Sequence, residues 1–129
     1  MGHERMPAIG HKVWAVAEGY IPPDDAKKSR EMTSHETLCI LNAGDEDADI
    51  GITVYFADRE PVGPYKVKCA ARRTLHLRFN DFKDPKPVPV NTDFSSVIAS
   101  NVPVVVQHTR LDSRQEALAL LSTMAYPVA

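Results

Sequence analysis

Apolar and polar residues alternate along several short segments of the chain, most clearly at 50–56. The residues of one face are Ile50, Ile52, Val54 and Phe56, and those of the other are Gly51, Thr53 and Tyr55. A period of two is typical of a β-strand with one face in a core. A polar stretch at 42–49 separates this segment from an apolar run at 38–41, so the pattern predicts a β-hairpin over 38–56.

Similar runs recur along most of the chain. They predict strands at 12–18, 35–42, 50–57, 65–70, 74–79, 95–99 and 104–109. Proline and glycine at 61–64 and the pair Ser100-Asn101 predict turns, and polar or proline-rich stretches predict long loops at 24–33 and 83–93. The face predicted to be buried comprises Ile50, Ile52, Val54, Phe56, Leu75, Leu77, Val104 and Val106. In the strand at 74–79, the basic side chains are expected on the outer face.

The C-terminal segment 112–126 fits two structures. Residues 115–121 have strong helical propensity, but a sandwich needs its last edge covered, so we favour a strand from about Ala117 onward. The fold class predicted is all-β, a single-domain antiparallel β-sandwich of jelly-roll-like type, with about seven or eight strands and little helix. The domain is expected to span 12–129, after a flexible N-terminal tail at 1–11.

Composition places the chain among ordinary globular proteins. Its 129 residues are 43% hydrophobic and carry a net charge of −2. No apolar run approaches the ~20 residues of a membrane helix, and the N-terminus has no signal-peptide pattern, so a cytoplasmic location is expected. Cys39 and Cys69 lie in apolar strands, which favours buried free thiols, although one disulfide between them stays open.

Charge is divided along the sequence. Six acids and one base lie at 45–60, and seven bases and two acids lie at 66–86. The two segments could neutralise each other within one protomer, or could meet between subunits of a closed ring. The basic segment also permits an alternative function as a DNA-binding regulator, with Lys66, Lys68, Arg72, Arg73 and Arg78 as the candidate contacts.

Catalytic motifs are missing from the sequence. The five histidines lack the His-x-His spacing of sandwich metal sites, and His35 and Glu36 are neighbours on a strand, so they point to opposite faces. There is no Gly-x-Ser-x-Gly elbow and no phosphate-cradling glycine loop. The sequence therefore predicts a protein that is not an enzyme and that has no metal and no cofactor.

Polar side chains gather instead at predicted strand ends. The candidate ligand-binding residues are Trp14, Glu18, His35, Glu36, His108, Arg110 and Asp112. A large aromatic residue beside acids and arginines at the rim of a β-fold suits a sugar or another small polar ligand. The alternative is structural, with Arg110 and Asp112 as an ion pair and Trp14 in the core.

Ten short motifs resemble the soluble sensory rhodopsin transducer family, and together they cover about residues 13–126. They are WAVAEGYIPP at 14–23, SHET at 34–37, LNAGDEDA at 41–48, EPVGPY at 60–65, RRT at 72–74, FND at 79–81, TDF at 92–94, SNVP at 100–103, VQHTRLDSRQ at 106–115 and LLST at 120–123. The departures are the residues before Val13 and the loop 24–33.

The resemblance implies a β-sandwich that assembles as a homotetramer and has a non-enzymatic role. It implies a signalling module that relays the signal of a membrane photoreceptor or another receptor, or that binds a sugar-like ligand or, as a weaker alternative, DNA. A carbohydrate-binding or metabolite-binding protein unrelated to light is a further alternative.

Overall fold

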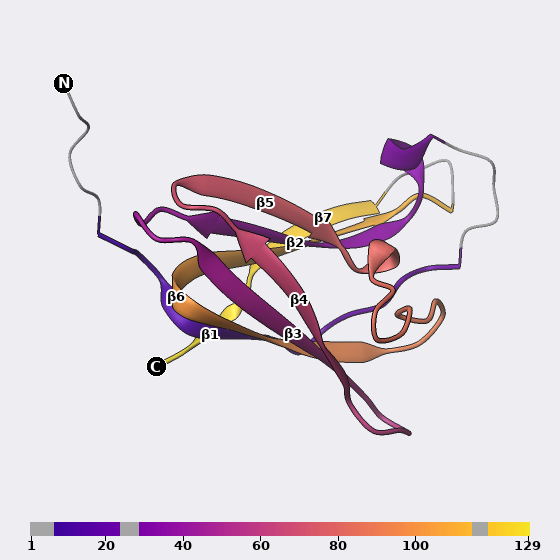
Figure 1. Ribbon diagram of the computed structural model, residues 1–129. Helices are drawn as coiled ribbons and strands as arrows, with labels where there is room; N and C mark the ends of the chain where they lie inside the picture. Colours follow the sequence, from indigo (N-terminus) through magenta and orange to yellow (C-terminus); the bar gives the residue numbers. More distant parts are fainter. Residues whose placement is uncertain (1–6, 24–28, 115–118) are drawn as a thin grey trace.

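The structure, a computed structural model, describes residues 7–23, 29–114 and 119–129 (Figure 1). It consists of strands and two short 3-10 helices. The strands are β1 (His11–Val16), β2 (His35–Asn42), β3 (Ala48–Phe56), β4 (Val62–Cys69), β5 (Arg73–Arg78), β6 (Phe94–Asp112), β7 (Ala119–Met124) and β8 (Tyr126–Val128), and the 3-10 helices are η1 (Arg30–Met32) and η2 (Phe79–Asp81). This confirms the predicted all-β class with little helix.

Two antiparallel sheets share one long strand. The first sheet has the order β4-β3-β6-β1-β8, and in the second sheet β2 lies between β5 and β6 while β7 pairs with the other side of β6. The first half of β6, 94–100, pairs with β3 in the first sheet. The second half, 105–111, pairs with β2 in the second sheet. Figure 1 shows β6 curving from one layer into the other, so the sandwich is closed by a single continuous strand.

The core lies between the inner faces of the two sheets. Five of the residues predicted to be buried are at most 3% exposed, namely Ile50, Ile52, Val54, Val104 and Val106. Phe56, Leu75 and Leu77 are half-buried and pack against that core. Trp14 is also a core residue, since it is 3% exposed, and its indole Nε1 is satisfied there by donating to the carbonyl oxygen of Val104 at 2.8 Å. Burying one large apolar side chain contributes about 1.5–3 kcal/mol.

The predicted hairpin over 38–56 is wrong. β2 pairs with β5 and β6, whereas β3 pairs with β4 and β6, so the two segments lie in different sheets. The Asn42 amide explains the crossing, since its Nδ2 donates to the carbonyl oxygens of Glu46 at 2.8 Å and Cys69 at 3.0 Å. These bonds direct the chain across the sandwich instead of back along β2.

The turn predicted at Ser100-Asn101 is wrong, and the turn predicted at 61–64 lies earlier, at 57–61, where it joins β3 to β4. β6 runs without interruption through Ser100 and Asn101, and side chains at this point form hydrogen bonds with the backbone. The Asn101 side-chain oxygen accepts from the backbone N–H of Asp49 at 2.7 Å. Gly63 and Pro64 lie inside β4, and this is possible because β4 is an edge strand whose one partner among the described strands is β3.

The C-terminal segment is a strand, as favoured, in the residues that the structure describes. β7 pairs with the second half of β6 and β8 pairs with β1. The part of the expected strand at 117–118 and the helix-prone stretch at 115–118 lie outside the described residues. Residues 1–6 of the expected N-terminal tail are likewise outside them, and β1 begins at His11.

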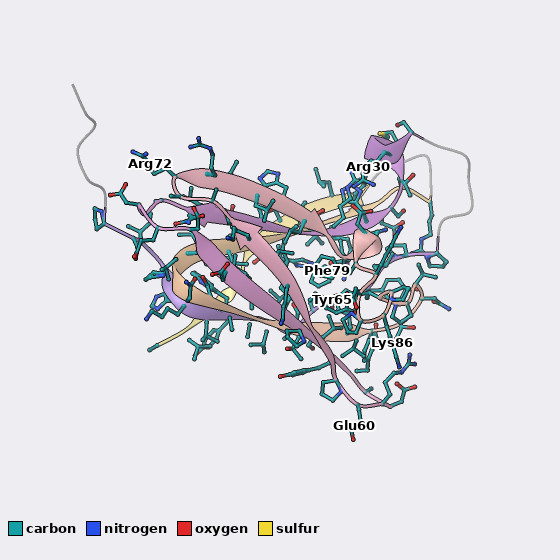
Figure 2. The ribbon with its side chains drawn as sticks, in the orientation of Figure 1. Arg30, Glu60, Tyr65, Arg72, Phe79 and Lys86 are labelled. Atoms are coloured by element: carbon teal, nitrogen blue, oxygen red, sulfur yellow. The ribbon has the colours of Figure 1, made fainter. Side chains whose placement is uncertain are left out.

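One end of the sandwich is covered by the loop 82–93. Phe82 and Val88 of this loop are buried, and Phe82 stacks on Tyr65 with ring centroids 4.9 Å apart. Figure 2 shows Tyr65 and Phe79 at this end, between the layers. The backbone N–H of Asn91 donates to Ile21 at 2.9 Å, which ties the loop to the segment that follows β1. This end is where the candidate site forms.

Candidate functional site

Four charged or titratable side chains form one chain of contacts at the covered end; we call Glu18, Glu36, His108 and Arg110 the charged cluster. The Glu36 carboxylate accepts from His108 Nε2 through one oxygen and from Arg110 Nε through the other. Arg110 Nη2 then donates to Glu18 at 2.9 Å. Because Glu36 and Arg110 are direct cross-strand partners of β2 and β6, the register itself brings them together.

Burial changes steeply along the charged cluster. The side chains of Glu36 and His108 are 0% and 2% exposed, that of Arg110 is 20% exposed, and that of Glu18 is 67% exposed. Burial works against the charge of Arg110, but its hydrogen bonds to Glu36 and Glu18 outweigh this and raise the pKa of the guanidinium above its ordinary value. The cluster thus connects solvent to the core through three contacts.

Asn80 of η2 holds the inner end of the cluster in place. Its side-chain oxygen accepts from the backbone N–H of Glu36 at 3.2 Å, and its Nδ2 donates to the carbonyl oxygen of Ser34 at 3.1 Å. Within the described residues, every buried side-chain nitrogen and oxygen has a hydrogen-bond partner. The cluster is therefore fully satisfied, which a buried charge requires if it is not to cost several kcal/mol.

A cleft of about 360 Å³ opens beside the exposed end of the cluster; we call it the rim cleft. Glu18, Tyr55, Asp93 and Ser95 supply its polar groups and its aromatic edge. Gly19 forms part of the wall, and a Cβ there would lie 2.5 Å from the Phe94 ring, so the wall needs glycine. Glu18 belongs both to the rim cleft and to the charged cluster.

The rim cleft has the chemistry of binding. Two carboxylates can accept hydrogen bonds from hydroxyl groups, Tyr55 offers a partly exposed ring, and the Ser95 hydroxyl donates to the Ala17 carbonyl at 2.6 Å. Within the described residues, no group of three or more His, Cys, Asp or Glu side chains could hold a metal ion. The arrangement suits a hydroxyl-rich or cationic small molecule.

The other candidate ligand residues lie elsewhere. Trp14 is 3% exposed in the core, and Asp112 forms an ion pair with Arg114 at 2.7 Å, not with Arg110. His35 faces the outer side of the second sheet, where its Nδ1 donates to the carbonyl oxygen of Thr33 at 2.7 Å. The structure thus brings together Glu18, Glu36, His108 and Arg110 and separates them from the other three candidates.

The candidate DNA contacts are distributed over both sheets. Lys66 and Lys68 lie on the outer side of β4, with Lys68 3.8 Å from Asp49, and Arg72 lies 3.7 Å from Asp45. Arg73 begins β5, and Arg78 ends it beside Arg30. Arg72 and Arg30 are at opposite ends of the view in Figure 2. The acidic and basic segments therefore make contacts within one protomer, and the DNA hypothesis stays a prediction.

Sequence reasoning missed Tyr55, Asp93 and Asn80. Tyr55 belongs to the alternating pattern of β3 and was assigned only to an outer face. Asp93 reaches the cleft because the loop 82–93 packs beside the end of β1, where Asp93 bridges to Tyr20. No local signal in the sequence specifies that packing. Both cysteines are free thiols, with Cys39 half-buried and Cys69 buried.

The stacked sheets and their shared strand define the chain as a small antiparallel β-sandwich protein. The model of the family described as Anabaena sensory rhodopsin transducer matches residues 9–127, so the chain belongs to that family. A search of curated proteins gives no significant match. No helix in the described residues is long and apolar enough to cross a membrane.

Two solved structures are similar over most of the chain. The Anabaena sensory rhodopsin transducer is 60% identical, with a TM-score of 0.75, and the match covers 82% of this chain and 100% of that one. The crystal structure of Thermotoga maritima 1070 is 38% identical, with a TM-score of 0.81, and the match covers 92% of this chain and 96% of that one.

Proposed function

We propose that this protein is a non-enzymatic, cytoplasmic signalling module that senses a small polar, sugar-like ligand or passes on the signal of a receptor such as a membrane photoreceptor. The observation that carries the proposal is the double role of Glu18. A ligand that hydrogen-bonds the Glu18 carboxylate in the rim cleft competes with Arg110, and Arg110 is the partner of the buried Glu36. Binding at the surface thereby changes an interaction inside the core.

The family supports the signalling part of this proposal, since the 60% identical protein is named a sensory rhodopsin transducer. The rim cleft supports the ligand part. Its carboxylates, hydroxyl and aromatic ring are the groups that recognise hydroxyl-rich molecules, and it holds no nucleophile paired with a base. A receptor that contacts this rim would act on the same Glu18–Arg110 ion pair.

A panel of hexoses and polyols tests the ligand part by thermal melting. A ligand that binds the native state raises Tm, because it stabilises that state by RT ln(1 + [L]/Kd). We expect the wild type and Glu60→Gln to show the shift and Glu18→Gln to lose it; Glu60 is an exposed carboxylate at the far tip labelled in Figure 2. An equal shift in Glu18→Gln, or none in the wild type, would contradict the proposal.

We further propose that the module is a homotetramer. The strands β7 and β8 each pair with one strand only among the described elements, and they expose a run of apolar side chains, namely Leu120, Leu121, Met124, Tyr126 and Val128, which are 41–70% exposed. Exposed apolar edge strands of this kind pair with other chains, and a second copy presents the same edge.

Sedimentation of two matched variants tests the assembly. Met124→Lys places a charge on the β7 edge, while Val90→Lys places one on an equally exposed apolar residue of the loop 82–93. We expect the wild type and Val90→Lys to sediment as tetramers and Met124→Lys to dissociate. A wild type that is a 14.3 kDa monomer at micromolar concentration would refute the assembly.

A further inference from the structure

A second concave surface lies on the outer side of the second sheet, away from the rim cleft. It has a volume of about 370 Å³, and we call it the outer groove. Its lining includes Arg30, His35, Thr37, His76, Arg78 and Thr109. The strand register explains why these residues lie together. Thr37 of β2 lies between its cross-strand partners Arg78 of β5 and Thr109 of β6. Two residues further along β2, on the same face, Cys39 lies opposite His76 of β5.

Arg78 is the fixed cationic group of the outer groove. Its Nη1 donates to the backbone carbonyl of Arg30 at 2.7 Å, which anchors the guanidinium. In the part of the chain that the structure describes, no carboxylate lies within ion-pair distance of Arg78; Asp81 is instead paired with Arg30. That pair, together with the nearby positive charge of Arg78, lowers the pKa of Asp81.

Hydrogen-bonding groups surround that guanidinium. The Thr109 hydroxyl donates to Ser122 Oγ at 3.0 Å, so in the groove it can act only as an acceptor, whereas Thr37 also lines the groove and carries a hydroxyl that can donate. His35 is oriented by its Nδ1 bond to Thr33, so its Nε2 edge is the one available to a ligand. The Arg78 guanidinium is the group that recognises a tetrahedral oxyanion, because its fork matches two oxygens at once. The His76 ring and the Thr37 hydroxyl can add donors, and the Nε2 of a neutral His35 ring can accept from a protonated phosphate oxygen or a ligand hydroxyl.

We infer that the outer groove binds the phosphate group of a small phosphorylated metabolite. A volume of about 370 Å³ is within the range of small-molecule sites and exceeds what a bare phosphate ion fills, so the organic part of the ligand lies along the threonine row. This inference goes beyond the function proposed for the rim cleft, and no residue is shared between the two sites.

Isothermal titration calorimetry at low ionic strength tests the inference with three probes: inorganic phosphate, a hexose monophosphate and the same hexose without phosphate. We expect the hexose monophosphate to bind at least tenfold more tightly than inorganic phosphate. In the Glu18→Gln variant, which removes a carboxylate of the rim cleft, the free hexose should give no heat. If inorganic phosphate bound and the hexose monophosphate did not, the claim that the ligand is a phosphorylated metabolite would be wrong. If neither bound at millimolar concentration, the claim that the groove binds phosphate would be wrong.

Variants locate the binding and separate it from the rim cleft. Arg78→Gln should weaken the hexose monophosphate at least tenfold, whereas Arg73→Gln, on the same strand but outside the groove, should stay within twofold of wild type. His76→Gln is an exposed second variant that should weaken binding if Arg78→Gln fails to fold. Glu18→Gln should leave phosphate binding intact. A folded Arg78→Gln that binds as the wild type does, or tighter binding of a short DNA duplex at the same residues, would overturn the inference.

Discussion

The two faces of the second sheet use similar residues in opposite ways. On the inner face, Glu36 and His108 are buried, Arg110 is partly buried, and Glu36 accepts from both of the others. On the outer face, His35, His76 and Arg78 line an open groove, and Arg78 has no carboxylate partner within the described residues. The two sets share β2, where the neighbours Glu36 and His35 differ only in parity; the inner set adds residues of β6 and the outer set residues of β5. Side-chain type therefore does not decide between a structural and a recognition role; the face of the strand does.

The inner face should dominate stability. Removing one partner of a buried ion pair leaves an uncompensated charge and costs about 3–5 kcal/mol, so we expect Glu36→Ala to lose that amount in urea unfolding. Glu36→Gln, which keeps acceptor and shape, should lose less.

Glu18→Gln is the matched control for this prediction, because Glu18 contacts the same Arg110 from the solvent side. Exposed ion pairs contribute about 0–1 kcal/mol, so this variant should lose at most that much. If Glu18→Gln and Glu36→Gln lost equal stability, the contrast between the buried and exposed ends of the cluster would be wrong.

The two cysteines sharpen the comparison between faces. Cys39 is half-buried and lines the outer groove, whereas Cys69 is 2% exposed on an inner face, where burial raises the pKa of its thiol. A thiol reagent should modify Cys39 of the native protein at least tenfold faster than Cys69, and mass spectrometry measures the two rates. Cys39→Ser should abolish the fast phase of modification. Equal rates at both thiols would contradict the placement of Cys39 in the open outer groove.

The smallest expected effect on stability concerns Asp112, the last residue of β6. Hydrogen bonds from Arg114 lower the pKa of the Asp112 carboxyl. A lowered pKa adds stability above the unfolded value of about 3.9, and this is lost as pH falls through the folded value. The stability gap between wild type and Asp112→Asn should therefore be small and constant from about pH 5 to 7 and shrink below about pH 4 in acid unfolding. A gap that grows in acid would contradict this sign.

Alternation in the sequence located most of the strands and the parity of their residues. It predicted β2 at 35–42 and placed Glu36 and His35 on opposite faces, which is the basis of the two sites. It could not predict partners, because strand pairing depends on contacts distant in the sequence. The hydrogen bond from Asn42 to Cys69 favours the placement of β2 and β3 in different sheets. The hydrogen bond from Asp49 to Asn101 favours the continuation of β6 through the predicted turn.

The site was predictable to the same extent. Glu36, His108 and Arg110 could be found because each lies at a strand end with a recognisable parity. The rim cleft could not, since Tyr55 and Asp93 meet only after the loop 82–93 packs against the segment following β1. Loop packing of that kind leaves no periodic signal in a sequence.

The shared strand β6 has a consequence for how the chain can change length over evolution. Inserting a single residue near Gln107 would turn His108 and Arg110 to the opposite face and shift the register with both β2 and β7. Insertions in the exposed stretches at 57–61 or 83–87 would disturb no such register. Length variation among relatives should therefore fall in loops such as these, and β6 should keep a constant length even where its residues change.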